Sequence, residues 1–373
     1  MNTIKIIGTA TALAPITQGV PPAEQNGGRK NLLEQRKLTI MTSAGPVELP
    51  VISGNSIRGA TRRIFIAQTL RALGIADQGT LDPMIAYFLL AGGTTDGGLS
   101  LNYEGFINET MTKLPFVELL GGSLHGAFFP SKMSVSFMIP LVGRVVELYQ
   151  KLGGGIAEGI NLDAFDLMEH IRNNPQRYTR KDDRGQETFA KINKLYDEIN
   201  EAARKASATP ENPEGFDGIK KATTKSGEEK DSAAMIYGLE NIPPGTPMFH
   251  TFSLEPCRKE TENAFWAFVD TFIRRGRVGG NFSKGYGWIS VEYRFPNGEP
   301  IDREISEKAA AYWRWLEEEG KRGEEEDGIK KYLTETMPKK LKELMIEAAI
   351  ENANAEKKKS EGKNKKNNGQ KAE

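Results

Sequence analysis

Residues 50–63, which read PVISGNSIRGATRR, decide the fold of the chain. A short apolar run ends at a Ser-Gly pair, and apolar side chains then recur at helical spacing. The pattern predicts a helix with Asn55 or Ser56 as its cap and Gly74 at its end. Because its apolar residues form two stripes, we expect this helix to be substantially buried. The stripes are Ile57, Ala60, Ile64 and Ala67, and Ile66, Leu70 and Leu73.

The first turn of this helix is a candidate anion site. A helix start presents unpaired backbone N–H groups and a partial positive charge. Arg58 and Arg62 lie four residues apart and would share one face, so a phosphate could meet N–H donors and two guanidinium groups. A capped helix with solvent-facing arginines fits the same spacing. Gly59 inside a helix costs about 1 kcal/mol relative to Ala, which predicts close approach of another backbone.

Residues 274–288, which read RRGRVGGNFSKGYGW, form the second decisive stretch. An amphipathic helix over 262–275 is predicted to end at Gly276, and a glycine-rich loop then leads into a strand over 286–294. Glycines let backbone N–H groups come close to phosphates, so this stretch is a candidate nucleic-acid site. Its candidate contact residues are Arg274, Arg275, Arg277, Phe282, Lys284 and Tyr286.

Two roles are open for the side chains of this loop. Phe282 and Tyr286 could stack on bases while Arg277 and Lys284 follow the phosphate backbone. Alternatively, the aromatic side chains cover the core and the arginines complement the carboxyl end of the preceding helix. Residues 284–291 also partly fit the signature of RNA-recognition domains, but no matching upstream signature is present. We therefore expect a loop and a strand rather than a standard base-stacking platform.

The order of predicted elements indicates an α+β fold. A long strand over 3–13 precedes the first helix, strands over 131–139 and 233–254 follow it, and the second helix leads to the closing strand. Residues 233–254 read as two strands joined by a Pro-Pro-Gly turn. This order is compatible with a ferredoxin-like β-α-β-β-α-β core, and a set of separate small α+β units is the alternative. Residues 14–36 read as a long exposed loop.

The predicted core comprises residues 1–160 and 232–295, and three further segments surround it. Residues 161–231 have low apolar density and read as an insertion that stands away from the core. Residues 296–352 are predicted to be mostly helical, with an acidic turn at 324–327. Residues 353–373 form a Lys-rich tail whose composition cannot pack a core.

Composition narrows the class of protein. The 373 residues are 38% hydrophobic, and the longest apolar runs are too short for a transmembrane helix. The start lacks the order of a signal peptide, and Cys257 is the single cysteine, so we expect a reducing cytoplasm and no disulfide. Fifty Lys and Arg balance fifty Asp and Glu, so any nucleic-acid site must be a local patch.

The sequence also lacks the common catalytic motifs. No phosphate-binding P-loop, H-E-x-x-H zinc motif or G-x-S-x-G nucleophile motif is present. The three histidines are far apart, without ligand-like spacing. Asp182 and Asp183 read as part of a solvated turn of mixed charge. We therefore expect no catalytic residue, no metal and no cofactor.

Residues 52–63 resemble the helix start of the CRISPR-associated RAMP superfamily, in which a small residue and Gly precede Ser, Leu or Ile, Arg and Gly. Residues 281–287, NFSKGYG, resemble the glycine-rich loop of the same superfamily, and the first strand and residues 235–254 also fit. The length and the stretch 180–184 are most similar to the backbone subunit of type IV effector complexes. A type I-D or type III backbone subunit is the near alternative.

This resemblance implies a modified RNA-recognition, ferredoxin-like palm with finger and thumb insertions. It implies that copies stack head to tail along a guide RNA and present its bases to a target nucleic acid, together with other complex subunits. Residues 161–231 would reach a neighbouring copy. The resemblance assigns guide phosphates to Asn55, Ser56, Arg58 and Arg62, and the same groove to Phe282, Ser283, Lys284 and Tyr286.

Two other functions remain open at this point. The chain could be a target-cleaving or guide-processing RNase of the same superfamily, but Asp96, Asp182 and Asp183 do not align with a catalytic aspartate, so we expect no nuclease activity. It could also be a generic RNA-binding protein that acts as a monomer, which the match at 284–291 would suggest.

Overall fold

The computed structural model describes residues 3–20, 32–42, 45–75, 81–93, 103–150, 163–180, 194, 197–199, 201, 235–322 and 328–350. Asp96, Asp182, Asp183, the turn at 324–327 and the tail at 353–373 lie outside these residues.

The strands are β1 (Ile4–Ala12), β2 (Leu32–Leu33), β3 (Lys37–Thr42), β4 (Gly45–Pro50), β5 (Gly122–Leu124), β6 (Ala127–Phe129), β7 (Met133–Val135), β8 (Ile139–Pro140), β9 (Gln176–Arg180), β10 (Met235–Leu239), β11 (Pro247–Leu254) and β12 (Ile289–Arg294). The α-helices are α1 (Gly54–Ala72), α2 (Pro83–Ala91), α3 (Glu104–Lys113), α4 (Pro115–Leu120), α5 (Gly143–Gln150), α6 (Ala164–Asn173), α8 (Lys259–Arg275), α9 (Asp302–Glu304), α10 (Ala310–Lys321) and α11 (Ile329–Lys331). A 3₁₀ turn covers Phe282–Lys284, π-helical turns cover Ile305–Ala309 and Tyr332–Thr336, and helix continues over 337–350.

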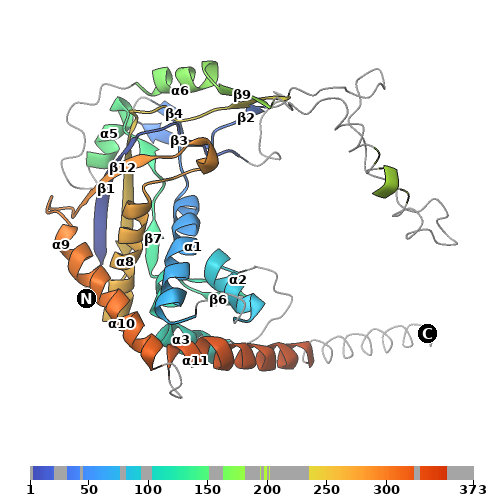
Figure 1. Cartoon of the computed structure of the whole chain (residues 1–373). Coiled ribbons are helices and arrows are strands. Elements are labelled where there is room, and N and C mark those ends of the chain that lie inside the picture. Colours follow the sequence, from blue (N-terminus) through green and yellow to red (C-terminus); the bar gives the residue numbers. More distant parts are fainter. Residues whose placement is uncertain are drawn as a thin grey trace, which may run out of the picture. The chain divides into compact units, whose positions relative to one another are not determined.

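The main sheet has the strand order β12-β1-β11-β7, with β8 also paired to β11, and every pairing is antiparallel. Along the chain, these four strands come in the order β1, β7, β11 and β12, so the order across the sheet is fourth, first, third and second. Helix α1 lies between β1 and β7 in the sequence, and α8 lies between β11 and β12 (Figure 1). Each helix therefore links two strands that have another strand between them, as in the split β-α-β units of a ferredoxin-like fold. The predicted α+β class with a ferredoxin-like core is confirmed.

The two faces of this sheet bury different groups of residues. Because side chains alternate along a strand, Ile6 and Ala10 of β1 join one hydrophobic cluster while Ile7 joins another. Phe252 and Phe249 of β11 divide in the same way. The first cluster contains the buried faces of α1 and α8, and the second contains those of α5, α6 and the β3–β4 hairpin. The sheet is therefore covered on both faces.

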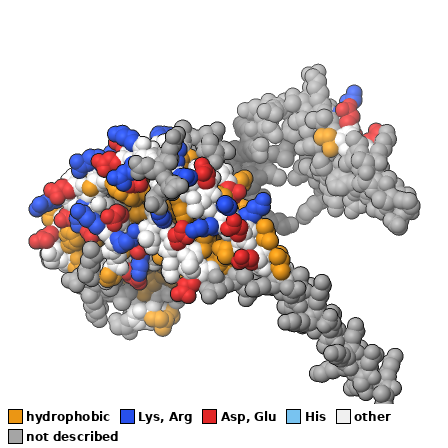
Figure 2. Space-filling view, turned by 90° about the horizontal axis from the view of Figure 1, so that it is seen from below, with side chains coloured by type: hydrophobic (Ala, Val, Ile, Leu, Met, Phe, Trp, Pro, Cys, Tyr) orange, Lys and Arg blue, Asp and Glu red, His pale blue; other side chains and the backbone are white. Residues whose placement is uncertain are grey.

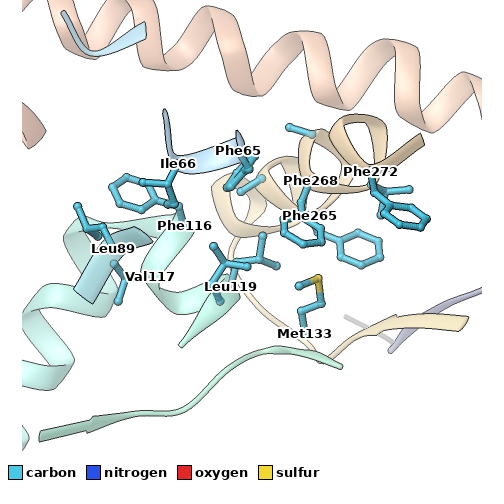
Figure 3. Close-up of a cluster of buried hydrophobic side chains, with 14 of the residues drawn as sticks. Phe65, Ile66, Leu89, Phe116, Val117, Leu119, Met133, Phe265, Phe268 and Phe272 are labelled. Atoms are coloured by element: carbon cyan, nitrogen blue, oxygen red, sulfur yellow. The ribbon is translucent and has the colours of Figure 1, made fainter. Parts of the chain in front are cut away.

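Aromatic side chains hold α1 and α8 together in the first cluster. Phe65 of α1 meets Phe268 of α8 edge to face, with ring centroids 5.6 Å apart. Phe268 and Phe272 in turn contact Phe252 of the sheet, and Figure 3 shows these α8 rings beside Phe65 and Met133. Edge-to-face pairs contribute about 0.5–1.5 kcal/mol each beyond the burial of their area. The position of α1 beside α8 is therefore well determined by packing.

The carboxyl-terminal helices belong to this same core. Tyr312 of α10 stacks on Phe65 with centroids 5.5 Å apart, and its hydroxyl lies 3.3 Å from Thr69 Oγ1. Ion pairs join Lys308 to Glu262 and Lys340 to Glu109. The buried members from this region include Tyr312, Leu316, Leu333, Met337 and Leu341. The sequence predicted the helices, but not that they complete the core beside α1.

Two strand predictions need correction. Residues 131–139 form β7 and β8 with a break between them, and the bridge from Ile52 to Met138 occupies that break. The two strands predicted over 233–254 exist as β10 and β11, but they belong to different sheets, since β10 pairs with β9 and β2. The turn at Pro243–Thr246 instead contacts β1, where Gly245 N–H donates to the Ala12 carbonyl.

The chain divides into two compact units. One comprises residues 1–19, 35–171 and 241–373, and the other comprises 20–34 and 172–240. The second unit differs from the insertion predicted over 161–231, since it includes 20–34 and 232–240 and begins only at the last residues of α6. Leu167 and Ile171 of α6 are buried in the cluster that contains Phe249, so this helix does not stand away from the core. Every predicted RNA-contacting residue lies in the first unit.

Within the described part of the chain, no helix combines the length and the hydropathy that crossing a bilayer requires.

Candidate nucleic-acid interface

Ser53 caps the start of α1. Its side chain accepts a hydrogen bond from Ser56 N–H at 3.2 Å, and its backbone is extended, as a capping residue requires. The prediction of Asn55 or Ser56 as the cap is therefore wrong. The helix starts at Gly54, where a Cβ atom would lie 2.1 Å from the Val135 carbonyl oxygen, so only glycine allows this approach to β7.

Thr17 and Gln18 join the start of α1 to the glycine-rich loop. The Gln18 side chain accepts from Ser53 N–H at 2.6 Å and donates to Ser53 Oγ at 2.8 Å. The Thr17 carbonyl accepts from Gly280 N–H at 2.7 Å, and Thr17 Oγ1 accepts from the Asn281 amide at 3.0 Å. The two stretches singled out from the sequence therefore lie side by side.

This junction also corrects the prediction of a long exposed loop over 14–36 at both of its ends, while 21–31 lie outside the described residues. Ile16, Thr17 and Gln35 are buried at 1% exposure or less. Gln35 donates to the Val51 carbonyl and accepts from Gln18 N–H, so it closes the same network. The hydrogen-bond partners of these polar side chains lie far away in the sequence. Their burial therefore leaves no pattern among neighbouring residues and was not predicted.

Close backbone contacts fix the shape of the loop. Gly279 has a φ of +82°, and a Cβ there would lie 2.4 Å from the Thr17 carbonyl oxygen. Gly287 has a φ of +84°, and a Cβ there would lie 2.2 Å from the Val278 carbonyl oxygen. At both positions the backbone is left-handed and lies so close to another backbone carbonyl that no side chain would fit, so only glycine is tolerated. The loop is therefore held in one shape.

Arg62 does not face a ligand. Its side chain is 5% exposed, and its guanidinium donates to the carbonyls of Phe88, Leu89 and Gly121 at 2.7–2.9 Å. Burial, with a smaller effect from Arg58, lowers the pKa of Arg62 to about 10. These carbonyls end α2 and α4, where a cation is favourable. The prediction that Arg62 binds a phosphate is wrong.

The exposed stripe of α1 is shifted by one residue from the predicted face. Asn55, Gly59 and Arg63 are spaced four apart and share a face, and Asn55 and Arg63 are exposed. Nothing lies within 4 Å of a Cβ placed at Gly59, so the expected approach of another backbone is absent among the described residues. Arg58 is half-buried beside this stripe; burial lowers its pKa, and its guanidinium reaches Asn55 Oδ1 at 3.4 Å.

Arg275 at the end of α8 and Arg277 in the loop each lie over an aromatic ring. The Arg277 guanidinium carbon lies 3.5 Å from the Trp288 ring centroid, and that of Arg275 lies 4.9 Å from the Phe282 centroid. Burial lowers the pKa of Arg275, and the positive charges of Arg63 and Arg277 lower it further. Three guanidinium groups therefore share one region. We call Arg63, Arg275 and Arg277 the arginine surface.

The other predicted loop residues have different surroundings. Arg274 is largely exposed and pairs with Asp270 at 2.8 Å one helical turn away. The Tyr286 side chain is 2% exposed, so it cannot stack on a base, and the alternative role of covering the core is correct for this residue. Ser283 and Lys284 are exposed on the 3₁₀ turn, and Ser56 is half-buried with its N–H bound to Ser53.

Two contributors were missed by sequence reasoning. Arg63 lies four residues after Gly59, on the exposed stripe, and this spacing could have marked it. Trp288 follows the glycines directly and is 41% exposed, which leaves its indole available to Arg277. Trp288 could have been recognised from the sequence as an aromatic residue that directly follows a loop with cationic side chains.

One face of the molecule carries charges of mixed sign (Figure 2). On the face shown in Figure 2, Lys and Arg side chains alternate with Asp and Glu across the described residues. The positive charges of Arg63 and Arg277 disfavour the charged form of Arg275, so an anion bound beside these three guanidinium groups would stabilise them. Such a group can hold successive phosphates of a polynucleotide.

The described residues hold no group of three His, Cys, Asp or Glu side chains that could bind a metal ion. His250 is fully buried, and burial lowers its pKa to about 3. Its Nδ1 lies 2.7 Å from the Tyr293 hydroxyl in the interior of the first unit. His250 is therefore a neutral core residue.

No protein family matches the chain. No curated protein matches it either. Among solved structures, the chain is similar to one described as a Type IV-B CRISPR complex, with 16% identity over 78% of this chain and 90% of that chain and a TM-score of 0.45. It is also similar to Csc2 of Thermofilum pendens, with 12% identity over 84% of this chain and 76% of that chain and a TM-score of 0.31. The first name agrees with the resemblance stated from the sequence.

Proposed function

We propose that this chain is a non-catalytic, RNA-binding backbone subunit of a CRISPR effector complex. The observation that carries the proposal is the arginine surface, in which Arg63 of α1 lies near Arg275 and Arg277. The Thr17–Gln18 junction holds the start of α1 beside the glycine-rich loop that follows these two arginines. The resemblance of residues 52–63 and 281–287 to the RAMP superfamily gives the ligand its class, a guide RNA.

The surroundings of the aromatic side chains favour contact with phosphates over contact with bases. Guanidinium groups already stack on one face of Phe282 and of Trp288, and Tyr286 is buried. A stacked guanidinium keeps its N–H edges in plane, which suits two-pronged hydrogen bonding to a phosphate. A subunit that holds the backbone in this way leaves the bases free to pair with a target strand.

The same proposal includes assembly. Repeated copies in head-to-tail contact generate an open helix along one RNA, and the second unit, residues 20–34 and 172–240, is the proposed contact to the next copy. Sizing with RNAs of increasing length tests this point. Multimers that grow with RNA length are expected, whereas one protein bound to every RNA would indicate the generic monomeric binder.

The deciding experiment removes the arginine surface. We expect the variant R63A/R275A/R277A to bind single-stranded RNA more weakly and to reduce the slope of log affinity against log salt by about 2, since each lost phosphate contact contributes about 0.7. The control is R294A/R303A/R322A, which removes three exposed arginines that pair with Glu292, Glu307 and Glu319. Equal slopes for the two variants would refute the proposed site.

Two further measurements test the class. RNA that copurifies with the protein is expected to consist of guides derived from CRISPR repeats, and unrelated cellular RNA would argue for the generic binder. Labelled RNA incubated with the protein and Mg²⁺ is expected to stay intact. Cleavage that is lost on replacing Asp96, Asp182 or Asp183 would instead identify an RNase.

A further inference from the structure

A cavity of about 470 Å³ opens between α1, α8 and α10, beside the arginine surface. Its lining residues are Ile64, Gln68, Asp270, Thr271, Arg274, Arg275 and Trp313. We propose that this cavity takes one unpaired nucleobase of the RNA strand held by the arginine surface. The inference rests on the proposed function, and it adds a base-binding subsite that includes a residue of the carboxyl-terminal helices.

The apolar side of the cavity provides a flat surface. Trp313 is half-buried, and its ring lies 5.0 Å from that of Tyr312 and 5.8 Å from that of Phe65, so neighbouring rings fix its orientation. Ile64 adds an apolar side chain that is 37% exposed on an otherwise well-packed helix. A base that stacks on an aromatic side chain gains about 1–3 kcal/mol, and every base has a face that can stack.

The polar side of the cavity matches the edge of a base. The Thr271 hydroxyl donates to the Ala267 carbonyl at 2.8 Å and lies 3.3 Å from Gln68 Oε1, so the Gln68 amide lies beside it. An amide presents both a donor and an acceptor, and the Asp270 carboxylate beside it adds acceptors. Nucleobase edges carry the same mixture of donors and acceptors, which an apolar peptide side chain lacks.

Arg275 connects the cavity to the phosphate path. Its side chain lines the cavity, its guanidinium stacks on Phe282, and it interacts electrostatically with Arg63 and Arg277. A nucleotide whose phosphate lies on the arginine surface can therefore place its base toward Trp313. The ligand is a nucleobase joined to a bound phosphate backbone, rather than a free small anion.

The test uses polyuridine oligonucleotides that carry one 2-aminopurine or one abasic position, moved along the strand. W313L keeps an apolar side chain but removes the flat ring, and Q68A removes the amide from an exposed position. We expect W313L to weaken binding by about 5- to 150-fold, the equivalent of one lost stacking contact. The salt slope should stay unchanged, because no phosphate contact is lost. Q68A should weaken binding less, and 2-aminopurine emission should be quenched at particular positions only.

The control is F128A, which removes an exposed aromatic ring from β6, 69% exposed, and should leave affinity unchanged. Thermal unfolding shows whether W313L remains folded, and Q68A provides the readout if it does not. Wild-type affinity for Q68A together with position-independent emission would overturn the cavity proposal while the effect of R63A/R275A/R277A still stood. If W313L loses protein assembly but keeps its RNA affinity, the cavity would bind a protein partner, and the nucleobase proposal would be overturned. If the arginine variant binds RNA normally, the proposed function itself fails.

Discussion

Arg62 of α1 and Arg275 of α8 are both withdrawn from water, and burial lowers the pKa of each, yet their surroundings differ. Arg62 donates to three backbone carbonyls, so its hydrogen-bonding requirement is met inside the protein. Arg275 stacks on Phe282 and has Arg63 and Arg277 as its charged neighbours. The difference shows that desolvation alone does not distinguish an arginine whose hydrogen bonds are met inside the protein from one whose neighbours are other cations.

The largest expected effect separates Arg62 from its neighbour in sequence. We expect R62A to lower the free energy of unfolding by about 4 kcal/mol, because three buried carbonyls lose their donor and an apolar space remains. R63A removes an exposed side chain and should change stability by less than about 0.5 kcal/mol. Urea unfolding measures both values.

RNA affinity should respond to the two substitutions in the opposite order to stability, with R63A having the larger effect. R63A is expected to weaken binding while the protein stays as stable as wild type. R62A protein that is still folded, checked at low temperature, should keep the wild-type salt slope, since Arg62 holds no phosphate. Equal stability of the two variants, or a reduced slope for folded R62A, would break the comparison.

A smaller effect is expected from the junction that brings the two regions together. G279A places a Cβ 2.4 Å from the Thr17 carbonyl oxygen at a φ of +82°, and we expect a loss of about 2–3 kcal/mol. G285A is the matched control, because Gly285 has a φ of +84° with nothing within 4 Å, so it should cost about 1 kcal/mol. RNA affinity should fall more for G279A than for G285A. Equal losses would show that contact with Thr17 does not shape the RNA site.

Much of the fold could be predicted from local pattern. The period-two strand at 3–13, the helix that starts near residue 54 and the helix that stops at Gly276 all carry signals within a few residues, and their order gave the ferredoxin-like core. The position of the carboxyl-terminal helices could not be predicted in this way. Their amphipathic pattern indicates that one face is buried, but not that Tyr312 packs on Phe65.

The two stretches singled out from the sequence lie side by side, but the surroundings of several of their side chains differ from those expected. Arg62 precedes Phe65 and Ile66 by three and four residues, so it shares their buried face, and this signal was in the sequence. The burial of Tyr286 and the stacking of Arg277 on Trp288 depend on how the glycine-rich loop folds back on Val278 and Thr17. Backbone contacts between distant residues leave no periodic pattern, so the structure was needed to separate the buried side chains from the exposed ones.

The smallest expected effect concerns Gly59, which lies between Asn55 and Arg63 on the exposed stripe. We expect G59A to raise the free energy of unfolding by about 1 kcal/mol, since a Cβ there meets nothing and helix propensity improves. G59L should keep most of this gain but weaken RNA binding, because its side chain covers the backbone beside the arginine surface. Gly105, in the first turn of α3, is exposed with nothing near its Cβ, so G105L should be stabilised less than G59L and should bind RNA as wild type does. If G59L and G105L bind RNA equally well, the RNA does not pass over α1, and only the loop side of the site would remain.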